Sequence, residues 1–296
     1  LGVAAFAGTP FDIDRERTAE LLGFDRVVEN SMDAASARDF LAEATAALAI
    51  HATTLSGLAE DIVVFANKGY IELSDNYSST SSIMPQKKNP DTLELTRAVA
   101  GDATGELTGL LTTLKGLPRA YNRDLQRAHP HTFRAVDAVV EASSIAAGAV
   151  ATANWNAEVL AAEADDGFAT ATGIADLLAM AGLPFRTAHE VVALAAEEAE
   201  HSDDGVTAAV LDAAAEEVLS ESLFTYVDEA SVESALDPAE SVASRDSAGG
   251  PASAAVDASI ETASEAVTTD SDALDARRET LAAAAGRLQQ EVDRYV

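Results

Sequence analysis

The sequence predicts an all-α protein: an elongated bundle of long helices followed by a smaller C-terminal helical domain. Alanine and leucine recur along the whole chain and runs of β-branched residues are few, which favours helix over strand. Three segments also carry apolar residues at helical spacing over about 25 residues, so each helix would be ~38 Å long. Helices of that length are typical of a bundle rather than of a compact globule.

The first and third long helices are predicted over residues 39–67 and 131–153. Apolar side chains recur at helical spacing through both segments. The first helix should end at Lys68, because Gly69 can adopt the left-handed conformation that closes a helix. Ahead of these helices, residues 1–38 are expected to form a loop with short helices.

The second long helix is predicted over residues 91–115. Asn89 would cap its free N–H groups, Pro90 is tolerated at the first position, and Asp91 would lie at the positive end of the helix dipole. Within the helix, three glycines fall four residues apart on one face. Because each costs an exposed helix ~1 kcal/mol, close approach of another helix is predicted along Gly101, Gly105 and Gly109.

The pattern breaks near residues 154–167, which predicts a domain boundary. We expect a central bundle domain over residues 1–155 and a small C-terminal helical domain over residues 156–296. Because the chain opens on Leu1 rather than methionine, the first domain is expected to be incomplete at its N-terminal side. Residues 228–268 are rich in serine, alanine and acidic residues, and are expected to form a mobile surface segment.

The net charge of the chain excludes some classes of binding partner. The chain holds 50 acidic and 19 basic residues, a net charge of −31, so nucleic acid and anionic membranes are not expected partners. The acids are spread through a chain that is 48% hydrophobic, which favours a folded protein hydrated in concentrated salt over an acidic tail. Cysteine is absent, no membrane span or signal peptide is recognised, and a cytoplasmic location is the default expectation.

The segment 79–90 carries the strongest chemical signal. It holds three serines, one threonine and two of the chain's four lysines, Lys87 and Lys88. A serine acts as a base only beside positive charge or N–H donors, which Lys87, Asn89 and the following helix N-terminus could supply. Such a site would hold a carboxylate and stabilise the charge that builds when an adjacent C–H loses its proton. A solvated serine-rich loop is the alternative, and physical reasoning alone leaves both open.

The same residues carry a family resemblance. Residues 81–90, Ser-Ser-Ile-Met-Pro-Gln-Lys-Lys-Asn-Pro, resemble the signature loop of the fumarase/aspartase superfamily. Residues 91–95, 110–118 and 120–126 closely resemble the corresponding segments of argininosuccinate lyases, as do residues 29–33 with 38–40 and residues 182–186 with 188–190. The likeness extends from residue 1 to about 195 and thinly beyond.

The resemblance implies a homotetramer with shared active sites that cleaves argininosuccinate to arginine and fumarate by β-elimination, without a metal or organic cofactor. It implies that Ser81 is the base that removes the Cβ proton. Lys87 and Asn89 would hold the succinyl carboxylate and stabilise the aci-carboxylate intermediate, and Glu94 would support the site. The implied substrate-binding residues are Ser82, Met84, Tyr121, Gln126, His129 and Arg38.

Three departures from the family pattern matter. Thr80 stands where the family has glycine, which restricts the backbone. His129 stands at a substrate-contacting lysine position, with Arg127 as a neighbouring cation that could replace its charge. Family members also carry a long segment ahead of the position of Leu1, including a histidine assigned as the general acid, so this chain alone is expected to hold an incomplete site.

Two alternatives remain open at this stage. Another fumarate-releasing lyase of the superfamily, such as adenylosuccinate lyase, fumarase or aspartase, would share the loop. The fold also serves as a catalytically silent structural protein in the eye lens, and the presence of Ser81, Lys87 and Asn89 argues against that loss of activity. No metal site is expected, because a pair such as His189-Glu190 lacks the i, i+4 spacing of a helical metal site.

Overall fold

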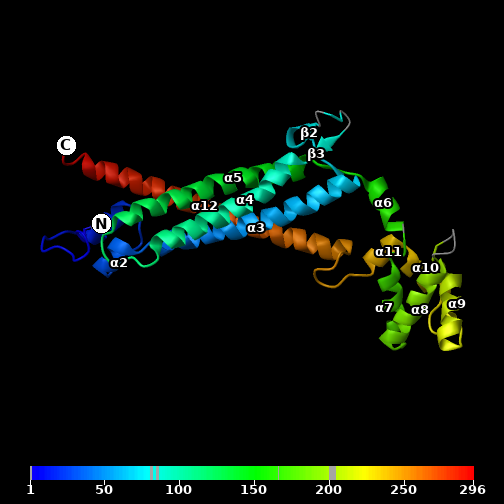
Figure 1. Ribbon diagram of the computed structural model, residues 1–296. Coiled ribbons are helices and arrows are strands. Elements are labelled where there is room, and N and C mark those ends of the chain that lie inside the picture. The colour runs from blue at the N-terminus through cyan, green and yellow to red at the C-terminus, as the bar shows by residue number, and fades with distance from the viewer. Residues whose placement is uncertain (1, 81–82, 85–86, 166, 200–204) are drawn as a thin grey trace. The chain divides into compact units, whose positions relative to one another are not determined.

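The computed structural model describes the chain except for residues 1, 81–82, 85–86, 166 and 200–204. It is built almost entirely of helices, which confirms the predicted all-α class (Figure 1). Two compact units are present: one comprises Leu1–Ala157 and Leu274–Val296, the other Glu158–Ala273. Residues 274–296 thus group with the first unit, whereas the sequence reading placed them in the second domain.

The first unit is a bundle of three long helices, α3 (Asp39–Lys68), α4 (Asp91–Leu114) and α5 (Ala128–Thr152), which lie side by side (Figure 1). Each helix turns a narrow stripe of residues inward at the spacing of an apolar helix face, and in α3 and α4 this stripe includes large side chains such as Leu41, Leu93 and Leu110. Alanine is the commonest buried residue of the three helices taken together. In α5 the buried stripe runs through Ala128, Thr132, Ala135, Val139, Ala142, Ala146 and Ala149.

Separate apolar clusters form at the two ends of this bundle. At one end Leu93, near the start of α4, packs with Ile62 and Val63 from the end of α3. At the other end Leu110, near the end of α4, packs with Leu41 from the start of α3. Helices α3 and α4 are therefore antiparallel, and the start of α4 and its end lie at opposite ends of the bundle.

The helix ends partly follow the predicted signals. Gly69 closes α3 with φ 77°, in the left-handed conformation that the sequence predicts. Helix α4 begins at Asp91 with Pro90 as its N-cap residue, and it has no side-chain capping hydrogen bond. The expected cap by Asn89 is therefore not formed, because the Asn89 backbone is paired with Ser79 in a short antiparallel ladder.

The glycine face of α4 is only partly covered within the described chain. A Cβ added at Gly109 would meet the His131 imidazole, whereas Gly101 and Gly105 have no described atom near the place of a Cβ. Beside them, Glu106 accepts two hydrogen bonds from Arg134, with N–O distances of 2.5 and 2.6 Å. The approach of a further helix to Gly101 and Gly105 stays a prediction.

Glu106 joins α4 to α5 through a charge cluster. Its hydrogen bonds from Arg134, with a second contribution from His131 Nδ1 at 2.5 Å, hold the pKa of the Glu106 carboxyl down at about 2. A carboxyl whose pKa is depressed in the folded state stabilises that state above its ordinary pKa. This contribution is therefore full at neutral pH and is lost as the pH falls from the ordinary glutamate pKa of about 4.3 towards 2.

Gly148 in α5 marks a tight contact with the segment ahead of the signature loop. A Cβ at this position would lie 1.9 Å from Tyr77 Oη and 2.4 Å from its Cζ, so the whole ring would have to move. We expect Gly148→Ala to lower the free energy of unfolding by about 1–3 kcal/mol, as overpacking does. Chemical denaturation in molar salt measures the change.

The matched control is Gly57→Ala in α3, where nothing described lies within 4 Å of the added methyl group. Alanine is favoured over glycine in a helix interior, so the control should raise the free energy of unfolding by about 0.5–1 kcal/mol. Equal stability of the two variants would contradict the Tyr77 contact.

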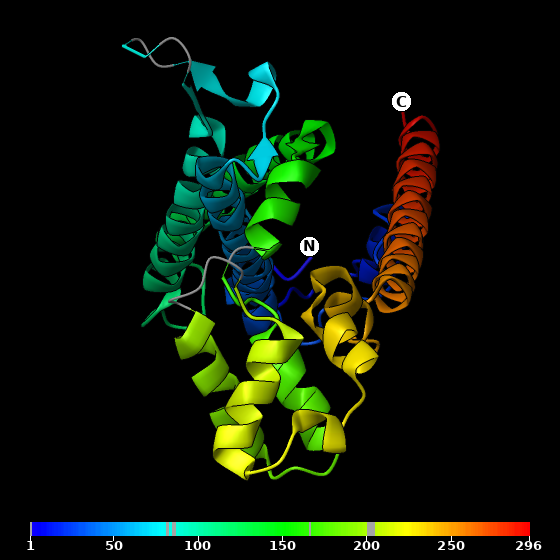
Figure 2. The ribbon, with the colours of Figure 1, turned by 90° about the vertical axis from the view of Figure 1, so that its right-hand side faces the viewer.

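The second unit is a small helical domain. Helices α7 (Ala171–Met180), α8 (Phe185–Ala199) and α9 (Ala208–Leu219) pack side by side, as both views show (Figures 1 and 2). Its core is one apolar cluster to which all three helices contribute, and which Val232 from α10 (Glu229–Leu236) joins. Its largest fully buried side chains are Ile174, Leu178, Val191, Leu211, Leu223 and Val232.

The segment 228–268, expected to be a mobile surface segment, is largely helical. It contains α10, α11 (Pro238–Ala243) and the start of α12 (Ser253–Val292). Sequence signals for these helices were present: Asp228 and Asp237 accept hydrogen bonds from backbone N–H groups three residues on, as N-cap residues do. The acidic composition of the segment favoured the interpretation of a mobile surface segment over that of helices.

The remaining helices are α1 (Arg15–Leu21) and α2 (Ser31–Ser36) in the first unit, and α6 (Ala157–Asp165) at the start of the second. In the first unit, Arg17 of α1 bonds Glu20 and also Glu291 of α12, with N–O distances of 2.8 and 3.4 Å. Ala284 of α12 is buried against Gly23. These contacts attach the end of α12 to the N-terminal segment.

Candidate active site

The stem of the signature loop is a two-residue antiparallel ladder between β2 (Ser79–Thr80) and β3 (Lys88–Asn89), in which Ser79 faces Asn89 and Thr80 faces Lys88. It lies at the end of the bundle where α4 begins (Figure 1). A second small ladder, β1 (Ile71–Glu72) with β4 (Asn154–Trp155), joins the end of α3 to the end of α5. The predicted base Ser81 and the predicted binding residue Ser82 lie outside the described residues.

Several polar contacts fasten this stem to the bundle. Thr92 Oγ1 in the first turn of α4 donates to the Tyr77 carbonyl at 2.6 Å, and Ser79 donates to Asp91. Tyr77 belongs to the short 3-10 helix η1 (Asp75–Tyr77), which precedes the ladder. The stem of the loop is therefore bonded to α4 through Thr92 and Asp91, and Tyr77 ahead of it packs against Gly148 of α5.

The two lysines of the loop have different surroundings. Lys88 Nζ lies 2.8 Å from a carboxylate oxygen of Glu72 and 2.8 Å from one of Asp75. Hydrogen bonds that Lys88 donates to Asp75 and to Glu72 raise the pKa of Lys88 well above its usual range, and Lys88 in turn lowers the pKa of Asp75. Within the described residues, the Lys87 ammonium has no ion-pair partner.

Lys87, Asn89 and the start of α4 together suit an anionic ligand. Lys87 is exposed and Asn89 is half-buried, one residue ahead of the N-cap Pro90. Because α4 lacks a side-chain cap, the first backbone N–H groups of a 24-residue helix remain available beside them. This arrangement can hold a carboxylate and stabilise an aci-carboxylate, which is the chemistry that the sequence predicts for the loop.

Two further predicted residues lie at the same end of the chain's bundle. Glu94 is exposed in the first turn of α4, and its backbone N–H bonds the Pro90 carbonyl at 3.1 Å. Met84 is also exposed, and its carbonyl accepts a hydrogen bond from the Lys87 backbone N–H.

The other four predicted binding residues lie at the opposite end of the bundle. Arg38 is the N-cap residue of α3, and Tyr121 lies in the connection after α4. Gln126 belongs to the 3-10 helix η2 (Arg123–Arg127), and His129 to the first turn of α5. Tyr121, Gln126 and His129 are all exposed.

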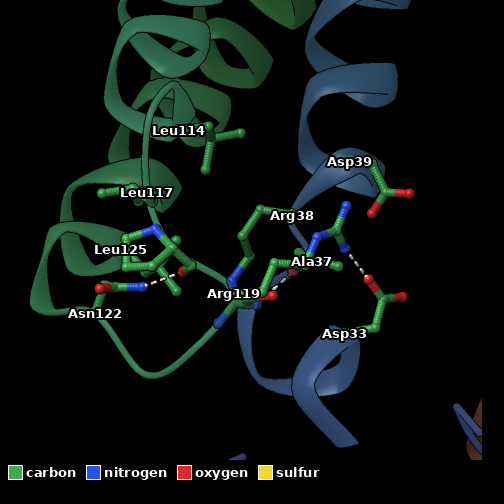
Figure 3. A pocket seen from close by; sticks show the side chains of 11 residues that line it. Asp33, Ala37, Arg38, Asp39, Leu114, Leu117, Arg119, Asn122 and Leu125 are labelled. Atoms are coloured by element: carbon green, nitrogen blue, oxygen red, sulfur yellow. Dashed lines mark hydrogen bonds and ion pairs between the residues drawn. The ribbon is translucent and has the colours of Figure 1, made fainter. Parts of the chain in front are cut away.

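Arg38 lines a pocket of about 290 Å³ between the α2–α3 connection and the segment after α4 (Figure 3). Its Nη1 donates to the Ala37 carbonyl at 2.5 Å, which holds the guanidinium over the helix start. The opposite wall is formed by Arg119, which pairs with Asp33, and by Asn122. Asn122 donates to the Pro118 and Ala120 carbonyls at 2.8 and 2.9 Å and so fixes the turn that leads to Tyr121.

Sequence reasoning did not single out Arg119, Asn122 or Asp33 in this pocket, nor Glu72 and Asp75 at the loop stem. The position of Arg119 directly after Pro118 was a usable signal, because arginine is uncommon relative to acids in this chain. The two stem acids gave no sequence signal, since acidic residues occur throughout the chain.

The chain does not bring the two groups of residues together. Helix α4 separates them, and at 1.5 Å per residue its 24 residues span roughly 36 Å. No small substrate can contact both groups on one chain. Within one chain the loop residues and the pocket residues are therefore two separate groups.

Among the described residues, no cluster of three or more histidine, cysteine or acidic side chains could hold a metal ion. Asp39–Lys68 and Arg123–Thr152 are long and apolar enough to cross a membrane by length and composition, each with a mean hydropathy of 1.3. Core helices of soluble proteins pass the same test, and these two supply the packed stripes of the bundle.

Comparisons with known proteins agree with the resemblance. Residues 1–105 match the lyase family and residues 168–243 match the argininosuccinate lyase C-terminal family. Argininosuccinate lyase of Haloarcula marismortui is 63% identical over 296 residues, all of this chain, and that of Natronomonas pharaonis is 64% identical over 295. This chain covers 59% of each of these relatives. Their names do not favour the alternative superfamily lyases.

Solved structures give the same fold. EDDS lyase in complex with formate superposes with a TM-score of 0.90 at 32% identity, covering 99% of this chain and 59% of that one. A class II fumarase of Schistosoma mansoni superposes with a TM-score of 0.56 at 17% identity, covering 72% of this chain and 41% of that one, which shows the fold alone.

Proposed function

The chain belongs to the argininosuccinate lyase family of the fumarase/aspartase superfamily, and from this premise we propose that it supplies the elimination chemistry of an argininosuccinate lyase. The observation that carries the proposal is the loop stem, which keeps Lys87 without an ion-pair partner among the described residues and places Asn89 beside the uncapped start of α4. That is a site for a succinyl carboxylate. The 63% identity to a named argininosuccinate lyase directs the choice of substrate within the superfamily.

The proposed reaction is a β-elimination. Ser81 removes a proton from the substrate Cβ, and Lys87 and Asn89 hold the adjacent carboxylate as it takes up charge. The electron pair then forms the carbon–carbon double bond of fumarate while the C–N bond breaks. The guanidino nitrogen leaves as arginine and takes up a proton from a general acid.

The other residues bind and orient the substrate. Glu94 supports the loop end from the first turn of α4, together with Ser82 and Met84. At the pocket end the arginine part of argininosuccinate contacts Tyr121, Gln126, His129 and Arg38.

Assembly and location are part of the same proposal. Because the two residue groups lie at opposite ends of α4, several copies must share each site, as in a homotetramer. The reaction needs no organic cofactor or metal, since the charge it builds is held by Lys87, Asn89 and helix N–H groups. The net charge of −31 fits a cytoplasm rich in salt and does not fit a nucleic-acid or membrane partner.

A chimaera tests the function. This chain is joined to the part of the Haloarcula marismortui lyase that it does not cover, and fumarate is followed by ultraviolet absorbance in molar salt. We expect fumarate from argininosuccinate with the chimaera, and none from adenylosuccinate, malate or aspartate. A soluble chimaera that releases fumarate from one of those three instead, or from none of the four, would overturn the proposal.

A further inference from the structure

The loop stem carries two adjacent lysines, and among the described residues only one of them, Lys88, forms ion pairs. Lys88 binds Glu72 and Asp75 at 2.8 Å each, whereas Lys87 has no ion-pair partner among the described residues. Successive residues of an extended strand point to opposite faces, so Lys88 and Asn89 face opposite ways. The carboxylates that capture Lys88 therefore also determine which face Asn89 takes.

The ladder itself is too short to fix this choice. It pairs only Ser79 with Asn89 and Thr80 with Lys88. A shift of one residue along a strand moves every side chain to the other face, and short polar strands specify their register weakly. Such a shift would offer Lys87, rather than Lys88, to Glu72 and Asp75.

We propose that Lys88 is a positioning residue that occupies Glu72 and Asp75, and thereby keeps Lys87 unpaired and Asn89 on the opposite face of the strand from Lys88. The inference rests on the proposed function, because Lys87 and Asn89 are the groups that hold the substrate carboxylate. It adds a residue that acts through its neighbours and does not touch the substrate.

The charge balance of the chain favours pairing of any free lysine with a carboxylate. There are 50 acidic residues and only four lysines, so an unpaired lysine beside two carboxylates would be captured unless another cation held them. The Lys88 side chain is 42% exposed, and ion pairs at such exposure add little to stability. Lys88 therefore acts by determining which of the two lysines stays unpaired, rather than by stabilising the fold.

Amine labelling of the intact chain in molar salt measures the first consequence directly. An ion-paired ammonium gives up its proton less readily, and one pKa unit corresponds to a tenfold change in the reactive amine. We expect Lys87 to react at least about fivefold faster than Lys88, as read by peptide mapping and mass spectrometry. In Lys88→Gln, the reaction of Lys87 should slow about fivefold, because the stem acids capture it.

Two variants separate positioning from simple loss of charge. Lys88→Arg keeps a cation for the two acids and should leave the labelling rate of Lys87 unchanged. Adding Glu72→Gln and Asp75→Asn to Lys88→Gln removes the captors, and the labelling rate of Lys87 should return to its original value. Unchanged Lys87 labelling in Lys88→Gln, or no recovery in the triple variant, would overturn the inference.

The matched control is Arg17→Gln. Arg17 also holds two carboxylates, Glu20 and Glu291, and its side chain is 41% exposed, yet it lies away from the loop stem. This change should leave the labelling of Lys87 unaltered. An equal slowing in Arg17→Gln would show a general loss of folding and would count against a role for Lys88.

Kinetics of the chimaera provide the second readout. Lys88→Gln should raise KM for argininosuccinate about fivefold or more, and both Lys88→Arg and the triple variant should restore it. A chimaera with no lyase activity would refute the proposed function while the labelling pattern still decides the position of Lys87. Normal KM together with slowed labelling would show that Lys87 does not hold the substrate, and would overturn the link between the stem and binding.

Discussion

Replacing Ser81 by alanine in the active chimaera is expected to lower turnover at least ~100-fold, within the usual contribution of a general base. The stem that carries this residue is fixed by the ladder between Ser79 and Asn89, by Thr92 and Tyr77, and by Lys88. The hydroxyl would act beside Lys87, whose charge favours loss of its proton. Stopped assays of fumarate release at saturating argininosuccinate measure the change in turnover.

Ser78→Ala is the matched control for Ser81→Ala. The Ser78 hydroxyl donates to the Ser74 carbonyl at 3.1 Å, a local bond at the base of the loop. Its loss should change turnover by no more than about twofold, because a typical hydrogen bond contributes only about 0.5–1.5 kcal/mol to the stability of the framework and this one does not touch the substrate. Near-normal turnover in Ser81→Ala would remove Ser81 from the role of base, and an equal loss in both variants would assign the effect to the framework.

The sequence predicted the bundle well because long helices leave a strong periodic pattern. Leu93, Leu110 and Val139 lie on buried stripes that 3.6-residue spacing identifies without tertiary information. The left-handed Gly69 followed from its type and place alone. Local rules decide these features.

Features that depend on pairing between distant segments were not predicted. Asparagine commonly caps helices, but the backbone of Asn89 is paired with Ser79 in the ladder and its side chain does not cap α4. The capture of Lys88 by Glu72 and Asp75 joins residues 13 to 16 positions apart through a fold that no local pattern encodes. The grouping of residues 274–296 with the first unit likewise depends on long-range packing, such as Ala284 against Gly23.

The sequence identified which residues make up the candidate site, but it did not show how they are arranged in space. The signature loop and the segment around Tyr121 were found from their motifs, yet the sequence places them about 35 residues apart and gives no sign of how they combine. Only the antiparallel helices show that Asn89 and Gln126 lie at opposite ends of the bundle. This separation leads to a prediction about assemblies that contain two different variants.

Two inactive variants from opposite ends of α4 should restore activity to each other when assembled together. Asn89→Ala disables the loop end of every copy and Gln126→Ala disables the pocket end. If each site takes its two ends from different copies, about a quarter of the sites in a random mixture combine two intact ends. Co-refolding the two chimaera variants in molar salt should therefore raise fumarate release from near background to roughly that fraction of the unmodified rate.

Variants from the same end provide the matched control. A mixture of Asn89→Ala with Lys87→Ala leaves every loop end defective, whichever copy supplies it, so no activity should return. Gln126→Ala mixed with Tyr121→Ala should behave in the same way at the pocket end. Recovery in same-end mixtures, or none in the opposite-end mixture despite mixed assemblies seen by native mass spectrometry, would contradict a site shared between copies. Recovery only between opposite ends would show that the 24-residue length of α4 separates two halves that assembly must join.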